Sequence, residues 1–565
     1  MDCKGKYVPF DPIKLDDRRW PSNVITKAPV WCSVDLRDGN QALVEPMNLQ
    51  EKLIFFKMLC DVGFKEIEVG FPSASLTEYK ILRAIIDDGL IPDDVTIQVL
   101  VQAREHLIRR TFEAIDGAKN VILHFYNSTS ALQRKVVFQK DMQGITDIAV
   151  EAARLVYSLG EEKRKTGTNI RYEYSPESFS GTECGFAVDI CSEVMQELHA
   201  SPENKVILNL PSTVQLSTPN CFADQVEYFC RNLPDRENAV ISVHPHNDRG
   251  TGIADAELAM MAGAERVEGT MFGNGERTGN VDIVTLALNM YTQGVDPMLD
   301  LSHITRLREI YEHCTKMQVP ERQPYAGDLV FTAFSGSHQD AINKGINYMR
   351  SHKSGVWQVP YLPIDPMDIG RSYEPIIRIN SQSGKGGAAF IMQQNFGYIL
   401  PKAMHPQLGA VVKAEADKLG TELSASDIYS IFMKEFVNKT NPFSLGRHNL
   451  TDSGSDGASV SVFSGTVFNG SMDIPINGEG NGPIDAFFNA LGHLGVSGYE
   501  FISYNEHAIG AGSHAKAVSY IELKAPDKKH YFGVGIHSNI NIASIMGVIS
   551  AIDRAVESNT VYVGK

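Results

Sequence analysis

The stretch Ala239-Val-Ile-Ser-Val-His-Pro-His-Asn-Asp248 begins with residues typical of a β-strand and ends with polar residues. Its apolar, β-branched beginning predicts a buried strand, and its polar residues fall where that strand stops. His244 and His246 are two residues apart, so both side chains point to the same side of the strand. Two histidines that emerge together in this way form half of a typical metal site.

Further β-rich runs lie on either side of this stretch between about residues 28 and 295, and longer amphipathic stretches follow them. Apolar residues recur at helical spacing most clearly from Ile145 to Leu159, just before Gly160. Eight βα units in roughly 270 residues predict a (β/α)8 TIM barrel, since an open doubly wound sheet usually has fewer strands. The predicted strands are Pro29–Leu36, Lys65–Gly70, Val95–Gln102, Asn120–Tyr126, Asn169–Ser175, Lys205–Leu210, Ala239–His246 and Arg266–Met271.

The βα rhythm stops after about residue 300, and a mainly helical stretch follows. Farther on, short β-rich segments alternate with Ser, Gly and Asn, and Gly-rich turns at 477–483 and 533–540 each precede an apolar helix. This weak internal repeat predicts a small α/β domain of two similar modules. The predicted fold class is α/β, with an N-terminal extension at 1–28, the barrel at 29–300, connecting helical subdomains at 301–435 and a C-terminal α/β domain at 436–565.

Composition excludes several classes of protein. Lys and Arg number 52 and Asp and Glu 68, and a chain with a net charge of −16 repels a nucleic acid backbone. No apolar run approaches the roughly 18 residues of a membrane span. The eight cysteines are spread thinly without a Cys-x-x-Cys pair, and the N-terminus lacks the features of a signal or transit peptide. We therefore expect a cytoplasmic protein with reduced thiols and neither nucleic acid nor membrane as partner.

Other strand ends supply candidate ligands to accompany the two histidines. Asp38 follows the first strand, and Asn280 and Glu276 lie in the Gly-rich loop after the eighth. A carboxylate, two imidazoles and an amide oxygen suit a divalent cation with open coordination positions, with Mg²⁺ favoured and Mn²⁺ or Zn²⁺ compatible. The alternative is that Asp38 and Gly39 form only a turn, and a His-x-His pair by itself is a weak signal.

Polar residues also alternate along the middle strands. His124 and Tyr126 share one face of the fourth strand, Ser175 and Glu177 share one face of the fifth, and Thr213 follows the sixth. Barrel interiors are usually filled with branched apolar residues, so inward polar side chains near the top indicate a ligand site. Lower in the barrel they would instead form a buried hydrogen-bond network, and both readings stay open.

The motifs Asp35-Leu-Arg-Asp-Gly-Asn-Gln41, His244-Pro-His-Asn-Asp248 and Gly273-Asn-Gly-Glu-Arg-Thr-Gly-Asn280 together resemble those of the 2-isopropylmalate synthases. These belong to a metal-dependent barrel family that also holds homocitrate synthases, citramalate synthases and hydroxymethylglutaryl-CoA lyases. The likeness covers nearly the whole chain and is greatest to the longer form of the enzyme, which carries a leucine-sensing C-terminal domain. Further matching motifs are Phe334–Gly345, Tyr361–Pro366 and Asn380–Gly387.

The resemblance implies a Claisen-type condensation of acetyl-CoA with 3-methyl-2-oxobutanoate to give 2-isopropylmalate and CoA, the committed step of leucine biosynthesis. It implies that a divalent metal binds the oxo acid and that Arg37 stabilises developing oxygen charge. The implied metal ligands are Asp38, His244, His246 and Asn280, and the implied substrate-binding or catalytic residues around the oxo acid are His124, Tyr126, Ser175, Glu177, Thr213, Glu276 and Gly279.

The resemblance also implies a base and a regulator. His338 assisted by Tyr361 is the predicted base for the acetyl methyl group, and in the family both reach the barrel of the partner subunit of a homodimer. Leucine is the implied inhibitor, and K⁺ is a possible activator. The Gly-rich turns would offer backbone N–H groups to the leucine carboxylate, although such glycines can also serve only to shape turns. The predicted regulatory residues are Gly480, Gly482, Gly533 and Gly535.

Three alternatives remain at this point. A sibling condensing enzyme would use 2-oxoglutarate or pyruvate, and an oxoglutarate enzyme should carry a basic group beyond Arg37, which the sequence does not obviously offer. An idle leucine-binding regulatory subunit would have no need of an open metal site. A hydrolase with His-x-His zinc ligands on an early strand fits poorly, because this pair lies on the seventh.

Overall fold

The computed structural model describes residues 6, 8–333, 335–352, 355–373, 387–419, 423–455, 458–510 and 515–558. The chain divides into two compact units. The first comprises Met1–Phe331 and Pro363–Tyr373, and the second comprises Thr332–Leu362 and Glu374–Lys565. Residues 380–386 of the Asn380–Gly387 motif, and Phe334 of the Phe334–Gly345 motif, lie outside the described residues.

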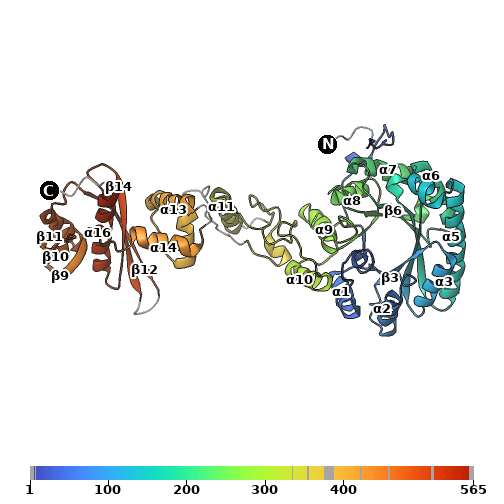
Figure 1. Cartoon of the computed structure of the whole chain (residues 1–565), viewed down its shortest axis with the longest axis horizontal. Coiled ribbons are helices and arrows are strands. Elements are labelled where there is room, and N and C mark those ends of the chain that lie inside the picture. The colour runs from blue at the N-terminus through green and yellow to red at the C-terminus, as the bar shows by residue number, and fades with distance from the viewer. Residues whose placement is uncertain are drawn as a thin grey trace. The chain divides into compact units, whose positions relative to one another are not determined.

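The first unit contains a closed barrel of eight parallel strands in chain order, as predicted (Figure 1). The last strand pairs with the first, with Val30 opposite Arg266 and Ser33 opposite Gly269. Closure brings the carboxyl ends of all eight strands to one rim, where active sites of such barrels lie. The strands are β1 (Val30–Ser33), β2 (Glu66–Gly70), β3 (Thr96–Gln102), β4 (Asn120–Ser128), β5 (Asn169–Glu177), β6 (Val206–Ser212), β7 (Ala239–Pro245) and β8 (Arg266–Gly269).

Helices surround the barrel and begin and end at sequence signals. In the first, Asn48 and Glu51 form a reciprocal capping box, and Gly63 ends the helix with φ +112°, a conformation that glycine adopts without strain. In the helix predicted after the fourth strand, Ile145 and Ala149 face the core. The helices are α1 (Leu49–Val62), α2 (Leu76–Asp87), α3 (Glu105–Ala114), α4 (Ala131–Gln133), α5 (Met142–Lys165), α6 (Cys184–Glu197), α7 (Pro219–Asn232), α8 (Gly252–Met261), α9 (Ile283–Thr292) and α10 (Ile304–Thr315).

The second unit begins with helices and continues into two similar β-β-β-α modules, so the predicted internal repeat is confirmed. Each module forms its own antiparallel three-stranded sheet, ordered β11-β10-β9 in the first and β12-β13-β14 in the second. The elements are α11 (Gly336–His352), α12 (Gly387–Phe396), α13 (His405–Leu419), α14 (Ala425–Phe436), β9 (Ser444–Ser455), β10 (Ala458–Phe468), β11 (Asp473–Gly480), α15 (Pro483–Ala490), β12 (Glu500–Ile509), β13 (Lys516–Lys524), β14 (His530–His537) and α16 (Ile540–Ser558).

The expectation that the Gly-rich stretches are turns is wrong for most of their length. Gly480 ends β11, and Gly533 and Gly535 lie inside β14, opposite Ile521 and Ser519 of β13. These glycines allow helices to approach the strands, because a Cβ on Gly535 would lie 1.7 Å from the carbonyl oxygen of Ala543 in α16. The glycines at 533 and 535 therefore serve close packing and do not present N–H groups at a helix N-terminus.

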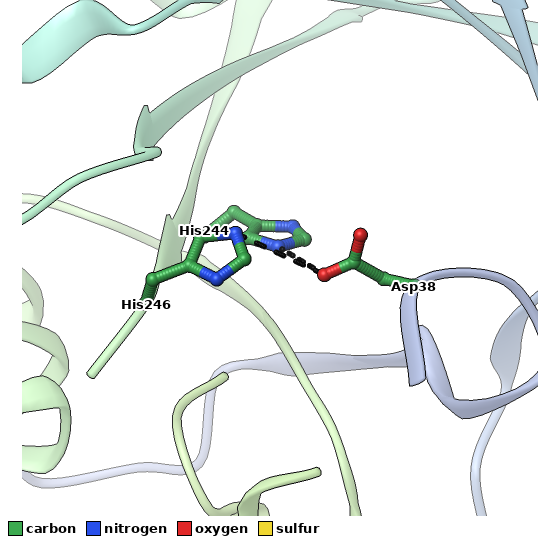
Figure 2. Close-up of side chains that lie close together, drawn as sticks. All are labelled: Asp38, His244 and His246. Carbon is green, nitrogen blue, oxygen red and sulfur yellow. Dashed lines mark ion pairs between the residues drawn. The ribbon is translucent and has the colours of Figure 1, made fainter. Parts of the chain in front are cut away.

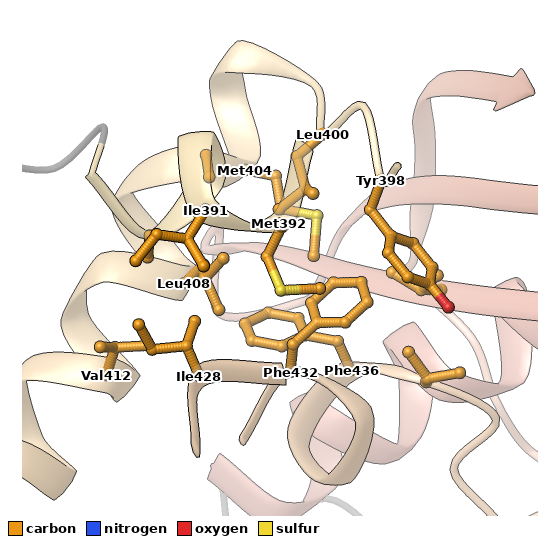
Figure 3. Packing of buried hydrophobic residues seen from close by; sticks show 14 of the residues in the cluster. Ile391, Met392, Tyr398, Leu400, Met404, Leu408, Val412, Ile428, Phe432 and Phe436 are labelled. Atoms are coloured by element: carbon orange, nitrogen blue, oxygen red, sulfur yellow. The ribbon is translucent and has the colours of Figure 1, made fainter. Parts of the chain in front are cut away.

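Both faces of the β12–β14 sheet are covered. Tyr520 and its neighbours face the cluster that α12, α13 and α14 contribute, in which Met392, Phe432 and Phe436 are fully buried (Figure 3). Ile521 belongs to a second cluster with residues of α16 on the other face. Because the alternating residues of one strand contribute to both clusters, the helices α12–α14 and the C-terminal sheet share one continuous packed structure.

Two further observations concern membrane-spanning helices and the state of the cysteines. Among the described residues, no helix is long and apolar enough to cross a membrane. The cysteines in this part of the chain are unpaired thiols: Cys32, Cys60, Cys184, Cys191, Cys221, Cys230 and Cys314.

A buried carboxylate on α16 predicts pH-dependent stability of the second unit. Asp553 accepts the backbone N–H of Phe443 at 3.0 Å, and burial raises the pKa of its carboxyl to about 7. Since the folded-state pKa lies above the unfolded value near 4, the carboxyl stabilises the fold below pH 4, and this contribution is lost as the pH rises through 7. Asp553→Asn keeps the acceptor and removes the charge, so we expect it to raise the melting temperature by a few degrees at pH 8.

The measurement is calorimetric melting of wild type and Asp553→Asn at pH 5 and pH 8. At pH 5 the shift should be clearly smaller than at pH 8, because the carboxyl is neutral in the folded protein and only ionisation in the unfolded chain has begun to remove its contribution. An equal shift at both pH values would show that ionisation of Asp553 plays no part.

Candidate active site at the carboxyl end of the barrel

The chain leaves β1 earlier than predicted and forms a single π-helical turn, Asp35–Gly39. The backbone N–H groups of Arg37, Asp38 and Gly39 all donate to the carbonyl oxygen of Val34, which holds this wide turn at the barrel rim. Asp35 accepts the backbone N–H of Met271, so the turn is tied to the end of β8. Wide turns of this kind are frequent at functional sites, and this one presents Arg37 and Asp38 to the barrel mouth.

Three of the four predicted ligand residues, Asp38, His244 and His246, come together at the barrel rim (Figure 2), and the fourth, Asn280, lies beside them. The Nε2 atoms of His244 and His246 lie 3.6 Å and 3.8 Å from Oδ2 of Asp38. Asn280 bridges His244 and Asp38, because its Oδ1 is 2.9 Å from Nε2 of His244 and its Nδ2 donates to Oδ2 of Asp38 at 2.8 Å. All four side chains are buried.

This donor set fits a divalent cation. One carboxylate, two imidazoles and an amide oxygen are ligands that Mg²⁺, Mn²⁺ or Zn²⁺ accepts. Within the described residues, Nδ1 of His246 is buried without a hydrogen-bond partner, an uncommon and costly state for a polar atom. The site also opens onto a cavity, which leaves space for further oxygen ligands.

The electrostatics of the site separate the two histidines. Burial alone would lower the pKa of His244, but Asp38 and Glu268 beside it raise that pKa to about 9. Burial and the neighbouring His244 lower the pKa of His246 to about 4. Burial opposes ionisation of Asp38 too, yet Arg37 and the histidines hold its pKa well below the usual range. A cation that binds here must displace a proton from His244.

Arg37 is a buried cation between two carboxylates. It donates to Oδ1 of Asp38 at 2.5 Å and also to Glu68 on β2. Burial would lower the pKa of its guanidinium, but Glu68 and Asp38 raise it further above its usual range. The positive charge is therefore permanent and is fixed beside the cavity.

The cavity at this rim has a volume of about 420 Å³. Nε2 of His124 lies 2.7 Å from Oγ of Ser175, Tyr126 accepts from Gln102, and burial raises the pKa of Glu177. The structure thus brings most of the predicted residues to one space. The lining comprises Arg37, Asp38, Gln41, Phe71, Leu100, His124, Tyr126, Ser175, Glu177, Asn209, Pro211, Thr213, His244, His246, Glu276 and Arg277.

The loop after β8 depends on its glycines. Gly279 has φ +97°, and a Cβ there would lie 1.9 Å from the carbonyl oxygen of Gly273. Arg277 ties the loop to the segment that follows β7, because its Nε donates to Oδ1 of Asp248 at 2.6 Å. The loop thereby delivers Asn280 to the cation site.

His338 and Tyr361 belong to the second compact unit. Their rings stack with centroids 4.1 Å apart, and both side chains are exposed. The structure therefore brings these two predicted residues to each other, and their role as the base stays a prediction.

Sequence reasoning missed several residues of the site. Arg277 is a second cation at the cavity, although its guanidinium is paired with Asp248. Glu68 and Glu268 lie directly beneath the cavity residues and contact Arg37 and His244. A sequence signal for Glu68 and Glu268 was present. The segments Glu-Ile-Glu at 66–68 and Arg-Val-Glu at 266–268 place charged residues at alternate positions of strands predicted to be buried.

A second cavity, of about 350 Å³, lies in the second unit at the N-terminus of α15. Gly482 is the N-cap of this helix, and Asp485 in its first turn accepts the backbone N–H of Asn481 at 2.9 Å. Phe488 and Phe501 meet edge to face at 5.8 Å and give the cavity an apolar side. The lining residues are Asn481, Gly482, Pro483, Ile484, Asp485, Phe488, Phe501 and Tyr504.

Three family profiles match consecutive parts of the chain. The HMGL-like profile matches residues 28–310, the alpha-isopropylmalate synthase post-catalytic domain-like profile matches residues 328–393, and the LeuA allosteric (dimerisation) domain profile matches residues 422–556.

Curated relatives match over nearly full length. The 2-isopropylmalate synthase of Clostridium acetobutylicum is 55% identical over 98% of this chain and 99% of its own. The enzymes of the same name from Rhodospirillum rubrum and Brucella suis are 52% and 53% identical, again over 98% of this chain and 99% of their own.

The loop geometry predicts that Gly279→Ala weakens cation binding. The added methyl group must displace the backbone of Gly273 and the adjacent Asn280, so we expect the affinity of the protein for Mn²⁺ to fall roughly tenfold or more. Isothermal titration calorimetry of the metal-free protein measures this. Gly250→Ala is the matched control, because Gly250 also has a left-handed φ of +72° but has no atom within 4 Å of the added Cβ. Equal affinities for both variants would contradict the prediction.

Proposed function

The chain belongs to the 2-isopropylmalate synthase family, and from this membership we propose that its barrel mouth condenses acetyl-CoA with 3-methyl-2-oxobutanoate. The products are 2-isopropylmalate and free CoA, and leucine acts as feedback inhibitor. The observation that carries the proposal is the near full-length match to synthases of this name in a chain whose barrel gathers Arg37, Asp38, His244, His246 and Asn280 at one rim.

We place a divalent cation among Asp38, His244, His246 and Asn280, with Mg²⁺ the preferred ion. The convergence of the ligand atoms of Asp38, His244 and His246, and the oxygen-rich cavity onto which they open, support this placement. Such an ion, when bound, supplies Lewis-acid polarisation of a carbonyl group. In this proposal the 2-oxo acid would bind in the cavity beside Asp38, His244 and His246, which line it.

The remaining cavity residues orient the oxo acid and stabilise the charge that develops on it during the reaction. Arg37 is permanently cationic and faces the cavity, so it stabilises the negative charge that develops on the ketone oxygen as the new carbon–carbon bond forms. Ser175 and His124 present a connected polar pair, and Thr213 and Glu177 border the same space. Leu100 and Phe71 offer apolar surface for the branched side chain of the substrate.

His338 and Tyr361 are our candidates for the group that removes the proton from the acetyl methyl carbon. Their stacked, exposed rings leave the imidazole accessible to a substrate. The resulting carbanion equivalent attacks the ketone carbon, and water then cleaves the thioester to release CoA. In the proposed homodimer each pair serves the barrel of the partner chain.

A synthase specific for 2-oxoglutarate is less well supported. Arg277 is a further basic group at the cavity, but its guanidinium already donates to Asp248 and to the carbonyl oxygen of Thr213. It is therefore engaged in loop contacts and is not free to bind a second substrate carboxylate.

The cavity at the N-terminus of α15 is the proposed leucine site. Pro483 carries no backbone N–H, so the N–H groups of Ile484 and Asp485 in the first turn are the ones that favour a carboxylate. The side chain of Asp485 carries the charge that suits an ammonium group, and Phe488 and Phe501 suit an isobutyl side chain. Of the four glycines predicted to be regulatory, Gly482 alone lines this cavity.

The activity is tested by CoA thiol release from acetyl-CoA with 3-methyl-2-oxobutanoate, pyruvate or 2-oxoglutarate, each with Mg²⁺ or with a chelator. We expect metal-dependent release that is selective for the branched acid, and a fall of at least about 100-fold in kcat/KM for Asp38→Asn. Preference for another acid would reassign the substrate, and release with none of them would leave an idle regulatory subunit as the better account.

The leucine site is tested by Phe501→Ala. Removing the ring deletes apolar contact surface, so the leucine concentration for half-inhibition should rise about tenfold or more while uninhibited activity stays the same. Phe468→Ala is the matched control, since both phenylalanines are 37% exposed and only Phe501 lines the cavity. Unchanged inhibition in Phe501→Ala would remove leucine from this cavity.

A further inference from the structure

Directly beneath the cation site, the barrel interior holds charged and amide side chains in place of the branched apolar residues usual there. We call this set the interior layer: Glu68, Gln98, Glu173, Asn209, Arg266 and Glu268, all essentially fully buried. Burying so many polar groups is costly unless each is bonded, so the arrangement must have a role that outweighs this cost.

Glu268 contacts more of these groups than a carboxylate ordinarily does. Its Oε2 accepts from Nδ1 of His244 at 2.7 Å and from Nδ2 of Asn209 at 3.1 Å. Its Oε1 accepts from Nη1 of Arg266 at 2.9 Å and from Nε2 of Gln98 at 2.8 Å. Both oxygens therefore have two donors each, which uses the full acceptor capacity of an ionised carboxylate.

The contact with His244 determines what that histidine can offer. An ionised carboxylate only accepts hydrogen bonds, so Nδ1 of His244 must carry the hydrogen. In the neutral ring the lone pair then lies on Nε2, the atom that faces Asp38 and Asn280. We infer that Glu268 is a positioning residue, which fixes the tautomer and ring orientation of His244 so that Nε2 is presented as the metal ligand. The inference rests on the cation site of the proposed function.

Arg266 keeps Glu268 in place. The two residues are two positions apart on β8 and point to the same side, into the barrel. The guanidinium of Arg266 also donates to Glu66 at 2.6 Å, to Ser242 at 2.9 Å and to Oε1 of Gln98 at 2.7 Å. This fixed fork leaves neither Glu268 nor Gln98 free to change orientation.

The same contacts explain why the cation belongs above the layer. Glu68, His124 and Glu268 form a second group whose ligand atoms lie close enough to hold a metal. Nε2 of Gln98 lies 2.8 Å from Glu68, 2.8 Å from Glu268 and 3.3 Å from Nδ1 of His124, and thus occupies the centre of that group. Because Arg266 holds the amide oxygen, the amide nitrogen fills this space, and Glu268 remains available to His244.

The test is the affinity of metal-free Glu268→Gln for Mn²⁺, measured by electron paramagnetic resonance of the free ion. An amide at this position has one acceptor oxygen for two pairs of donors, so either His244 and Asn209 or Arg266 and Gln98 must face an NH₂ group. We expect the affinity to fall 10- to 100-fold. We also expect the visible absorption bands of the Co²⁺-loaded protein to shift, because the orientation of His244 changes.

Glu66→Gln is the matched control. Glu66 is the other close carboxylate partner of Arg266 and also pairs with Arg171, but none of its contacts among the described residues is with His244. This variant therefore perturbs Arg266 without removing the partner of the histidine. Its Mn²⁺ affinity and Co²⁺ spectrum should match those of wild type. A folded Glu268→Gln protein that binds Mn²⁺ within about twofold of wild type would overturn the inference.

Two other outcomes of the Mn²⁺ titration are distinguishable from unchanged affinity in Glu268→Gln. If wild type itself binds no Mn²⁺, the cation site of the proposed function fails, and the inference fails with it. If Glu268→Gln does not fold, Glu268→Asp keeps the charge and withdraws the carboxylate by one methylene group. Loss of affinity in Glu268→Asp supports a role for the contact with His244, whereas full affinity shows that charge alone suffices and overturns the inference.

Discussion

The guanidinium of Arg266, fully buried inside the barrel, is the interaction on which the rest of the site depends. It forms ion pairs with Glu66 and Glu268 and orients the amide of Gln98. It also lies 3.4 Å from Glu173, whose carboxyl has its pKa raised by burial. Burial would lower its pKa, but the surrounding carboxylates raise it well above the usual range, so the charge is permanent. An uncompensated carboxylate in this interior would be strongly destabilising, and one cation with a rigid fork of donors prevents this for several carboxylates together.

The layer that Arg266 organises supports the chemistry at the rim above it. Glu268 contacts His244, and Glu68 contacts both Arg37 and His124. Each of these rim residues therefore has a partner below that restricts its orientation before any ligand arrives. Such preorganisation matters because a cation ligand or an oxyanion-stabilising group that has to reorient loses part of its effect. The second unit has its own constraint, the sheet packed on both faces, which joins the connecting helices to the regulatory modules.

The sequence predicted the barrel well because its signals are local. Each strand is a short apolar run, and closure of eight such units follows from their number and spacing. Asp38, His244, His246 and Asn280 could be predicted because strand ends must converge at one rim. Glu268 and Gln98 could not be assigned partners, since their contacts join strands far apart in the chain. Gly533 and Gly535 were misread as turn residues, because close helix packing and tight turns both require glycine.

The central claim is that the cation binds among Asp38, His244 and His246 and not within the filled group below them. Anomalous diffraction from crystals grown with Mn²⁺, recorded at the manganese absorption edge, tests this most directly. The account predicts one strong peak in each barrel, between the carboxylate of Asp38 and the two imidazoles. A peak among Glu68, His124 and Glu268, or no peak in the barrel at all, would contradict it.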